Sequence, residues 1–497
     1  MTSTVGSEPQ RYGLYVGNEF HAPAHGSTRD SISPTTGETW AIVAEANGGD
    51  VDAAVRTARE ALSGPWGDLF PVQRGDMLRR LADLVEREAE RLAEIEVRDN
   101  GKTIREMTGQ YKIIPAWYRY FASLADKVDG KTLPRERAGM FAYTVVEPVG
   151  VVGAITPWNS PGLQLAFKAA PALAGGNTLV VKPSEYTPIA TLEHAGLFEE
   201  AGFPPGVVNV VTGGAEAGAA LAGHHGVDLI VFTGSDVTGR KVGAAAGEAL
   251  SDVILELGGK SPQLVFADCD MDQAAIGVAA GVFSGTGQTC IAGSRVYVEE
   301  PIVEEFTARV VEIAKRLHLG NPIEWETEVG PVCFERHLER VLGFMDSAAA
   351  EGAEVLAGGE RATEGELAEG FFFEPTVLGG VRQDMRVMRE EIFGPVMGIQ
   401  TFSDEDQLVA LANDTHLGLA AGIWSTNLLR THRLVPRLEA GTVWVNNYRL
   451  SSPQTPLTGF KDSGVGFENS QNTLNQFTRQ KAVWLDYSGQ AKDPFRL

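Results

Sequence analysis

Five short apolar runs rich in Val and Ile alternate with helical stretches in the middle of the chain. Buried parallel strands read as continuous apolar runs because both faces of their sheet are covered. The alternation therefore predicts an α/β fold with a doubly wound, open twisted sheet. The predicted strands are 149–156, 178–182, 207–211, 229–233 and 253–257, and the predicted helices between them are 161–173, 189–201, 215–222 and 237–250.

Amphipathic helices are predicted before these runs. Apolar residues recur at helical spacing between residues 77 and 95, and Gly101 follows as a stop signal, so one long helix is expected there. Asp50 is predicted to cap a shorter helix that ends at about Leu62.

Two further segments are predicted to be extended. Residues 129–147 read as a hairpin that projects before the main sheet resumes, and residues 476–487 alternate enough to form a strand. A strand of this kind could pair with a neighbouring subunit. A second α/β pattern follows Gly258 and continues to about residue 474.

Length, charge and cysteine content narrow the class of protein. A chain of 497 residues is too long for one hydrophobic core, so two or three domains are expected. The net charge of −23 argues against nucleic acid or an anionic membrane as the main partner. The three cysteines have no close spacing, which indicates a reducing compartment. Neither a signal peptide nor a run long enough to cross a bilayer is recognised, so we expect a cytoplasmic protein.

Polar residues and Gly follow all five predicted strands. Ligands bind at the carboxyl edge of a doubly wound sheet, so this edge is the predicted binding site. In chain order, the residues are Pro157-Trp158-Asn159, Lys182-Pro183-Ser184-Glu185, Gly213-Gly214, Thr233-Gly234-Ser235 and Glu256-Leu257-Gly258-Gly259.

Cys290 stands in a run of Gly, Ser and Thr between a predicted helix at 271–283 and a predicted strand at 294–299. Reactive cysteines lie in polar, partly open turns beside helix ends, whereas structural ones lie inside apolar runs. The position favours a nucleophile, although a bystander thiol in a loop is the alternative that the residue alone leaves open.

Common binding motifs are absent or incomplete. No Gly-x-Gly-x-x-Gly joins a strand to a helix. The stretch Gly258-Gly259-Lys260-Ser261 resembles the end of a P-loop, but Ile254 stands where the first Gly is required, so we reject that interpretation. No Cys or His spacing indicates zinc, and no metal is expected.

Six motifs together carry a resemblance to a known family. The sequence resembles the aldehyde dehydrogenase superfamily from about residue 12 to residue 485, with the motifs in the same order and spacing. The motifs are Pro157-Trp158-Asn159, Lys182-Pro183-Ser184-Glu185, Phe232-Thr233-Gly234-Ser235, Glu256-Leu257-Gly258-Gly259-Lys260-Ser261-Pro262, Gly287-Gln288-Thr289-Cys290 and Glu391-Ile392-Phe393-Gly394-Pro395.

The resemblance implies a domain organisation and an assembly. A cofactor-binding domain would comprise residues 1–128 and 148–257, and a related α/β catalytic domain residues 258–474. A small β element at 129–147 and 475–497 would bridge subunits, giving a homodimer or homotetramer.

It also implies NAD(P)-dependent oxidation of an aldehyde to a carboxylic acid. Cys290 would attack the carbonyl, with the Asn159 amide and the Cys290 N–H as oxyanion donors, and Glu256 would activate the water that hydrolyses the thioester. A coenzyme A-dependent acylating enzyme is one alternative, against which Glu256 argues. A non-catalytic binding protein is another, against which the retention of all three residues argues.

The resemblance assigns cofactor contacts as well. Lys182 and Glu185 would bind the adenosine ribose, and a carboxylate there favours NAD over NADP. Ser235 would hold the pyrophosphate, while Glu391 and Phe393 would contact the nicotinamide ribose and ring. A plain core aromatic is the alternative for Phe393. The other assigned positions are Thr156, Pro157, Trp158 (mainly packing that positions Asn159), Ser184, Gly214, Gly218, Phe232, Thr233, Gly234, Leu257 and Gly258.

Departures from the family pattern concern the substrate. Ser160 stands where many relatives have Phe, which favours a roomier tunnel for a bulky, aromatic or heterocyclic aldehyde. Tyr448 and Arg449 lie on a loop that could line the entrance. We expect Arg449 to be a surface residue; if it faced inward, a carboxylated semialdehyde would become the plausible substrate.

Overall fold

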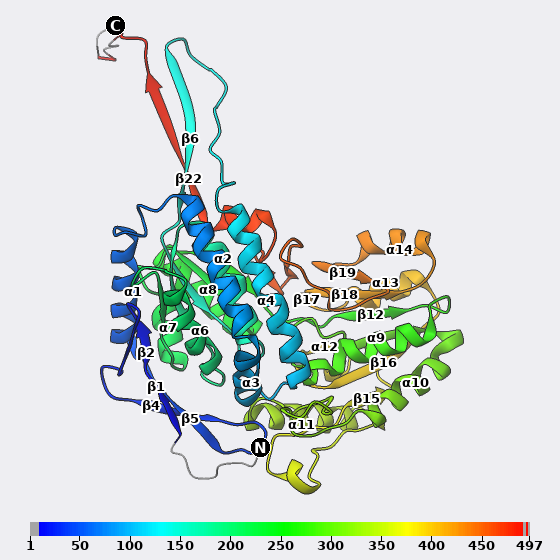
Figure 1. The fold of residues 1–497 in the computed structure, drawn as a ribbon. Helices are drawn as coiled ribbons and strands as arrows, with labels where there is room; N and C mark the ends of the chain where they lie inside the picture. The colour runs from blue at the N-terminus through cyan, green and yellow to red at the C-terminus, as the bar shows by residue number, and fades with distance from the viewer. Residues whose placement is uncertain (1–8, 491–493, 496–497) are drawn as a thin grey trace.

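The computed structural model describes residues 9–490 and 494–495 (Figure 1). The predicted ranges 1–128 and 475–497 therefore lie partly outside the described residues, at 1–8, 491–493 and 496–497. The described chain contains two large, mostly parallel sheets with helices on their faces, and a long two-stranded ribbon that projects from the molecule (Figure 1). The predicted α/β fold class is confirmed.

An eight-stranded sheet holds the five predicted strands as parallel neighbours in the order β11-β10-β7-β8-β9. The chain leaves β7 toward β8 on one side and returns through β10 on the other, so the strand order reverses between β7 and β10. A crevice at the carboxyl edge is expected at such a switch point. The strands are β7 (Val151–Ile155), β8 (Thr178–Lys182), β9 (Val208–Val210), β10 (Leu229–Thr233) and β11 (Asp252–Glu256), with β2 (Leu14–Val16), β3 (Glu19–His21) and β21 (Gly464–Val465) at the edges.

Helices cover both faces of this sheet because each presents an apolar side to it. One core contains apolar side chains of five helices, α2 (Pro71–Arg87), α3 (Ala89–Asn100), α4 (Ile104–Leu124), α5 (Pro161–Ala174) and α6 (Ile189–Glu200). The other core contains apolar side chains of three helices, α1 (Gly48–Leu62), α7 (Ala215–Ala222) and α8 (Asp236–Ala249).

Two predicted helix boundaries are wrong. Asn47, and not Asp50, caps α1: its Oδ1 accepts hydrogen bonds from the N–H groups of Gly49 and Asp50, while Asp50 supports the cap from its third position. The predicted long helix is two helices, α2 and α3, because the backbone leaves helical geometry at Glu88. The predicted stop at Gly101 is confirmed by its left-handed conformation.

A seven-stranded sheet in the order β14-β15-β16-β13-β12-β18-β19 forms the second unit. Its strand β12, which lies between β13 and β18, was not predicted. Because β12 follows Gly258-Gly259-Lys260-Ser261 directly, no helix begins there and the P-loop is excluded. The strands are β12 (Pro262–Val265), β13 (Arg295–Glu299), β14 (Glu354–Ala357), β15 (Thr376–Gly379), β16 (Val396–Phe402), β18 (Ala420–Trp424) and β19 (Thr442–Val445).

Six helices accompany this sheet, and their apolar faces pack on it in two cores. The predicted helix before Cys290 is confirmed as α9. The helices are α9 (Met271–Phe283), α10 (Val303–Arg316), α11 (Glu335–Ala350), α12 (Arg386–Arg389), α13 (Glu405–Asn413) and α14 (Leu428–Leu434).

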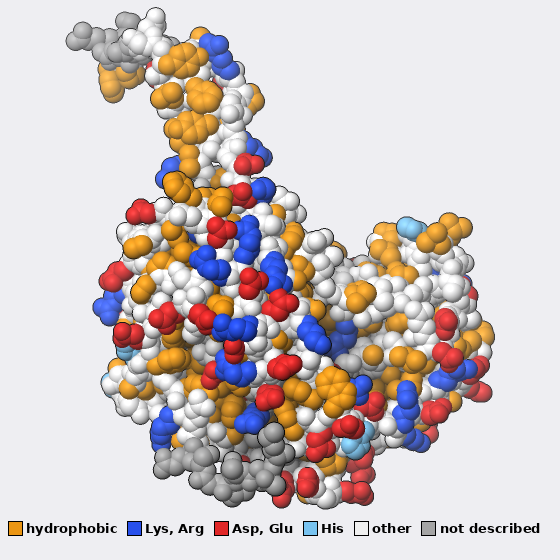
Figure 2. Space-filling view, viewed as in Figure 1, with side chains coloured by type: hydrophobic (Ala, Val, Ile, Leu, Met, Phe, Trp, Pro, Cys, Tyr) orange, Lys and Arg blue, Asp and Glu red, His pale blue; other side chains and the backbone are white. Residues whose placement is uncertain are grey.

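The projecting ribbon consists of β6 (Met140–Pro148) and β22 (Thr478–Asp486) in antiparallel pairing (Figure 1). The predicted strand near the C-terminus is therefore confirmed. The segment 129–147 also turns back on itself as predicted, through an antiparallel bridge between Thr132 and Tyr143 and backbone hydrogen bonds from the Leu133 N–H to Ala142 and from the Thr144 N–H to Lys131. The main strand partner of β6 is nevertheless β22, a pairing that was not predicted. Hydrophobic side chains lie along the ribbon (Figure 2).

Small sheets complete the described residues. They are β1 (Gln10–Tyr12), β5 (Thr39–Ala44) and β4 (Thr28–Ile32) in one sheet, and β17 (Leu417–Gly418) with β20 (Phe460–Lys461) in another. None of the helices described for this chain is long and apolar enough to cross a membrane.

Candidate active site

The three predicted catalytic residues come from separate segments that meet between the two large sheets. Asn159 follows β7 and donates a hydrogen bond from Nδ2 to the carbonyl oxygen of Gln288, 2.9 Å away. Gly259, three residues after Glu256, lies so close to the Cys290 loop that a Cβ there would be 2.2 Å from the Cys290 carbonyl oxygen. The amide, carboxylate and thiol segments are thus held together by backbone contacts.

The loop before Cys290 has an unusual backbone. Gly285, Thr286 and Gly287 all have positive φ angles, of 62°, 56° and 68°. A Cβ on Gly287 would lie 2.1 Å from the carbonyl oxygen of Gly394, so only Gly fits there. The loop therefore packs closely against the segment that contains Glu391, and this contact fixes the position of the loop that leads to Cys290.

The Cys290 thiol is protonated in the resting protein at neutral pH. Burial raises its pKa to about 12, and the nearby charges of Glu391 and Glu256 act in the same direction. A thiolate is the nucleophilic form of cysteine. Attack by this sulfur therefore requires a base that accepts the proton as the new bond forms.

Glu256, the residue predicted to be a base, is deeply buried. It is only 3% exposed, and neither carboxylate oxygen makes a well-formed hydrogen bond to any residue of the described chain. Burial raises the pKa of Glu256 well above its usual value, the charge of Glu468 raises it further, and the charge of Lys168 lowers it. A carboxyl group with a raised pKa takes up a proton readily near neutral pH.

Lys168 and Glu468 form a buried ion pair beside Glu256 that the sequence did not reveal. The Lys168 Nζ donates to Glu468 Oε1 at 2.8 Å, to Thr233 Oγ1 at 2.7 Å and to Gln164 Oε1 at 3.1 Å. Its side chain has no exposed surface. One signal was available, because Lys168 is the single charged residue in the otherwise apolar helix α5.

The predicted ribose site lies after β8. Lys182 Nζ is 3.3 Å from Glu185 Oε2, so the two predicted residues contact each other. A Cβ on Gly218 would meet only the Lys182 side chain, at 4.0 Å, which leaves open space beside the lysine. A cleft of about 610 Å³ opens at Glu185 and is also lined by Phe334 and Arg336. The buried Thr156 Oγ1 has no hydrogen-bond partner among the described residues.

The helix α8 begins at Ser235, whose Oγ accepts a hydrogen bond from the Thr238 N–H. The Ser235 side chain therefore already caps α8. A phosphate at this helix start would bind the neighbouring backbone N–H groups instead. The remaining predicted positions lie at the same edge of the sheet: Pro157, Trp158, Ser184, Gly214, Phe232, Thr233, Gly234, Leu257 and Gly258.

Glu391 and Phe393 belong to the second α/β unit and contact residues that follow strands of the eight-stranded sheet. Glu391 Oε1 accepts a hydrogen bond from the Gly259 N–H at 3.0 Å, and burial raises the pKa of Glu391 to about 7. Phe393 has a φ of 61° and meets the Trp158 ring edge to face, with 5.0 Å between ring centres. The predicted residues on the two units thus touch each other.

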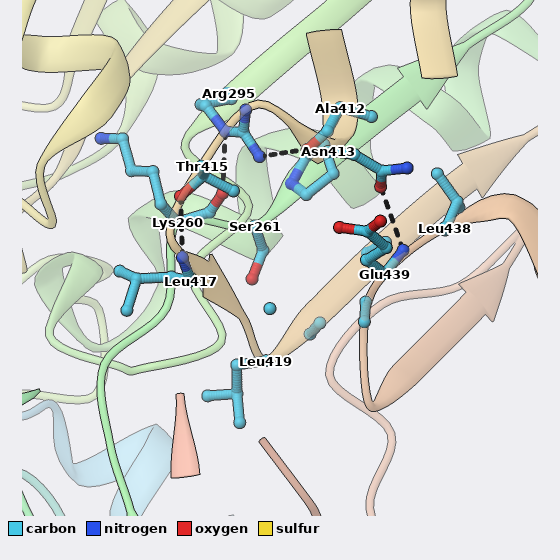
Figure 3. A pocket seen from close by; sticks show the side chains of 15 residues that line it. Lys260, Ser261, Arg295, Ala412, Asn413, Thr415, Leu417, Leu419, Leu438 and Glu439 are labelled. Atoms are coloured by element: carbon cyan, nitrogen blue, oxygen red, sulfur yellow. Dashed lines mark hydrogen bonds between the residues drawn. The ribbon is translucent and has the colours of Figure 1, made fainter. Parts of the chain in front are cut away.

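A small pocket in the second unit is lined by Lys260 and Arg295, among other residues (Figure 3). Its volume of about 10 Å³ holds no more than one water molecule. Arg295 donates to the carbonyl oxygens of Lys260 at 2.8 Å and Ala412 at 2.7 Å, so it joins β12, β13 and α13 (Figure 3). This pocket has no room for a substrate.

Arg449 is not the surface residue that we expected. It is half-buried, and its Nη1 donates to the carbonyl oxygen of Ser284 at 2.9 Å. The reason is a positive φ of 67° at Arg449, which turns the loop after β19 so that the exposed position falls on Leu450. Within the described chain, no three His, Cys, Asp or Glu side chains gather as metal ligands.

Comparison with known proteins places these features in a family. A family model described as "Aldehyde dehydrogenase family" matches residues 21–483. The structure is similar to an NAD+ complex of aldehyde dehydrogenase from Bacillus cereus, with 41% identity over 96% of this chain and 97% of that chain and a TM-score of 0.93. It is also similar to betaine aldehyde dehydrogenase from Staphylococcus aureus in complex with NAD+, with 37% identity over 98% of this chain and 97% of that one and a TM-score of 0.96.

Proposed function

The chain belongs to the aldehyde dehydrogenase family and is an NAD-dependent oxidoreductase acting on aldehydes, and we propose that it forms the carboxylic acid through a covalent intermediate on Cys290. One observation carries this proposal. Glu256 is a buried carboxylate without a well-formed hydrogen bond to a described residue, at the end of β11 and three residues before Gly259, which lies against the Cys290 carbonyl. Such a carboxylate is costly to maintain unless it moves a proton.

In the first step the Cys290 sulfur bonds to the aldehyde carbon. The thiol proton passes to Glu256, and the carbonyl π electrons move to oxygen, which gives a thiohemiacetal. The Asn159 amide and the Cys290 backbone N–H donate to that oxygen, each stabilising the transition state by about 3 kcal/mol. The hydrogen bond from Asn159 to Gln288 fixes the amide before the substrate arrives.

The residues of the cofactor edge fit a dinucleotide. Thr156 has a buried hydroxyl without a partner in the described chain, and open space lies beside Lys182 and Gly218. Lys182 and Glu185 would hold the adenosine ribose, the start of α8 the pyrophosphate, and Glu391 and Phe393 the nicotinamide end. When bound there, NAD supplies a hydride acceptor. The Glu185 carboxylate would repel a 2′-phosphate, so we propose a preference for NAD over NADP.

Before the last step Glu256 releases the thiol proton to solvent and is again a carboxylate. It then removes a proton from water, whose oxygen attacks the thioester carbon. The carbon–sulfur bond then breaks, the acid leaves, and Cys290 regains a proton. Water is a far weaker acid than a thiol, so hydrolysis depends on the base more strongly than the attack by Cys290 does. Burial raises the pKa of Glu256 most, the charge of Glu468 raises it further, and the charge of Lys168 lowers it.

A panel of aldehydes with NAD, NADP, or NAD plus coenzyme A tests this function. We expect NADH to form without coenzyme A, and Cys290→Ala to abolish it while NAD still binds. A strict requirement for coenzyme A would favour the acylating alternative, and no reduction with any aldehyde would favour a binding protein.

Three further assignments belong to the proposal. The division at residues 257 and 258 is supported by cores drawn almost entirely from one side of it, with Leu474 and Phe477 joining the first core from the other side. A homodimer or homotetramer through the ribbon of β6 and β22 is supported by its exposed apolar side chains, Phe141, Val145, Trp484 and Leu485, and light scattering after gel filtration tests it.

A cytoplasmic location is supported by the three free thiols.

A further inference from the structure

Two cationic side chains converge on one point near the catalytic cysteine. A Cβ added to Gly285 would lie 3.6 Å from Lys102 Nζ and 3.9 Å from Arg449 Nη2. Gly285 stands five residues before Cys290 in the positive-φ loop. The two cations therefore lie beside the loop that leads to Cys290.

Three distant segments build this cationic cluster, which we define as Lys102, Ser160 and Arg449. Lys102 lies between α3 and α4, Ser160 precedes α5, and Arg449 follows β19. Lys102 Nζ donates a hydrogen bond to Ser160 Oγ at 2.8 Å. The space that a short side chain at position 160 provides is thus filled by an ammonium group.

No contact ion pair neutralises the cluster. Two carboxylates lie nearby, but Glu106 accepts from the Gly285 N–H, and Glu96 accepts from the Tyr111 hydroxyl and the Gly162 N–H. Within residues 9–490, neither Lys102 nor Arg449 has a carboxylate oxygen within 4.0 Å of its nitrogens. A buried cation without such a partner is destabilised by desolvation.

The cost falls mainly on Lys102, which is only 4% exposed. The pKa of Lys102 is lowered to about 8, mainly by burial and also by the charge of Arg449, although the charges of Glu106 and Glu96 act to raise it. An anion bound between the two cations would remove this penalty. Donors for it are present: Lys102 keeps further N–H groups, Ser160 keeps its hydroxyl hydrogen because its oxygen accepts from Lys102, and Arg449 presents Nη2.

We propose that the cationic cluster binds a carboxylate at the far end of the substrate, so that the preferred substrates are semialdehydes, molecules with an aldehyde at one end and a carboxylate at the other. The inference rests on the proposed function of Cys290, since it places the anion beside the attacking sulfur. The same charges disfavour a cationic substrate such as betaine aldehyde, on which the similar enzyme from Staphylococcus aureus acts by its name.

Matched substrate series test the inference. Malonic, succinic, glutaric and adipic semialdehydes are compared with propanal, butanal, pentanal and hexanal at saturating NAD, and kcat/KM is measured for each. We expect at least one semialdehyde to exceed its matched alkanal by ten-fold or more, chiefly through a lower KM. Betaine aldehyde should be the poorest of the substrates.

Variants separate recognition from folding. A hydrogen bond to a charged group contributes about 1.5–3 kcal/mol, so Arg449→Gln should lower the ratio of semialdehyde to alkanal kcat/KM by about 10- to 100-fold. Arg449→Lys keeps the charge and should retain part of the preference. Arg105→Gln is the matched control, because Arg105 is exposed near the start of α4 and should leave the ratio as in the wild type.

The outcomes are distinguishable. Oxidation of alkanals with no preferred semialdehyde, or a ratio that Arg449→Gln leaves in place, would overturn the carboxylate site while the oxidation chemistry stands. No NADH from either series would overturn both proposals.

Discussion

Replacing Lys168 by Met removes the only cation that contacts Glu468 in the described structure, directly beside the proposed base. Lys168 has no exposed surface, and Glu468 is 2% exposed. The variant keeps the volume of the side chain but leaves two buried carboxylates, Glu468 and Glu256, without a compensating charge. Breaking a buried pair in this way costs about 3–5 kcal/mol, because one charge stays behind without a partner.

The expected change in melting temperature follows from the size of the chain. Unfolding entropy is about 2.1 cal/mol/K per residue, so 497 residues give about 1 kcal/mol/K. Lys168→Met should therefore lower Tm by about 3–5 °C. It should also move the rise of kcat with pH to higher pH, since the charge of Lys168 lowers the pKa of Glu256.

Scanning calorimetry and pH–rate profiles measure both effects. The double variant Lys168→Met with Glu468→Leu removes the uncompensated charge and should recover most of the lost Tm. The exposed Lys241, changed to Met, controls for loss of a lysine as such. A single variant as stable as the wild type, or a double variant with the summed losses of both single changes, would refute the reasoning.

Three more changes test other parts of the site. Asn159→Ala removes an oxyanion donor and should lower kcat by about 100- to 1,000-fold in steady-state assays, with NAD affinity by calorimetry as in the wild type. Gly259→Ala places a Cβ against the Cys290 backbone oxygen, and kcat should fall more than ten-fold even though the change adds one methyl group. Folding raises the pKa of Glu256 above its unfolded value, so the stability from its protonated form is lost as pH rises through the folded pKa. Glu256→Gln should therefore gain about 1–3 °C in Tm over the wild type at about pH 8 and less at about pH 5; an equal difference at both would count against a raised pKa.

The local pattern of apolar and polar residues was sufficient to predict much of the fold. The strands at 178–182 and 229–233 and the helix at 215–222 agree with β8, β10 and α7 at both ends, because apolar runs bounded by Gly or polar residues report burial directly. The polar residues that follow the strands lie together at the carboxyl edge of the sheet, where the binding site is predicted. The resemblance then placed Asn159, Glu256 and Cys290 in segments that do meet.

Contacts between segments far apart in the sequence could not be predicted from the local pattern of apolar and polar residues. The ion pair of Lys168 and Glu468 joins residues 300 positions apart, and β6 pairs with β22 across a similar separation. Arg449 was misplaced because one positive φ angle decides which residue of its loop faces inward. Such features depend on tertiary packing, which periodicity does not report.

The covalent intermediate on Cys290 is the claim that the whole account depends on. Mass spectrometry of peptides from Glu256→Gln, mixed with NAD and an accepted aldehyde, tests it most directly. The account predicts an acyl group on the peptide that contains Cys290, at up to one per chain, with NADH formed in a single burst and none of either in Cys290→Ala. Turnover at the wild-type rate with no acyl group on Cys290, or an acyl group on Cys269 or Cys333 instead, would contradict it.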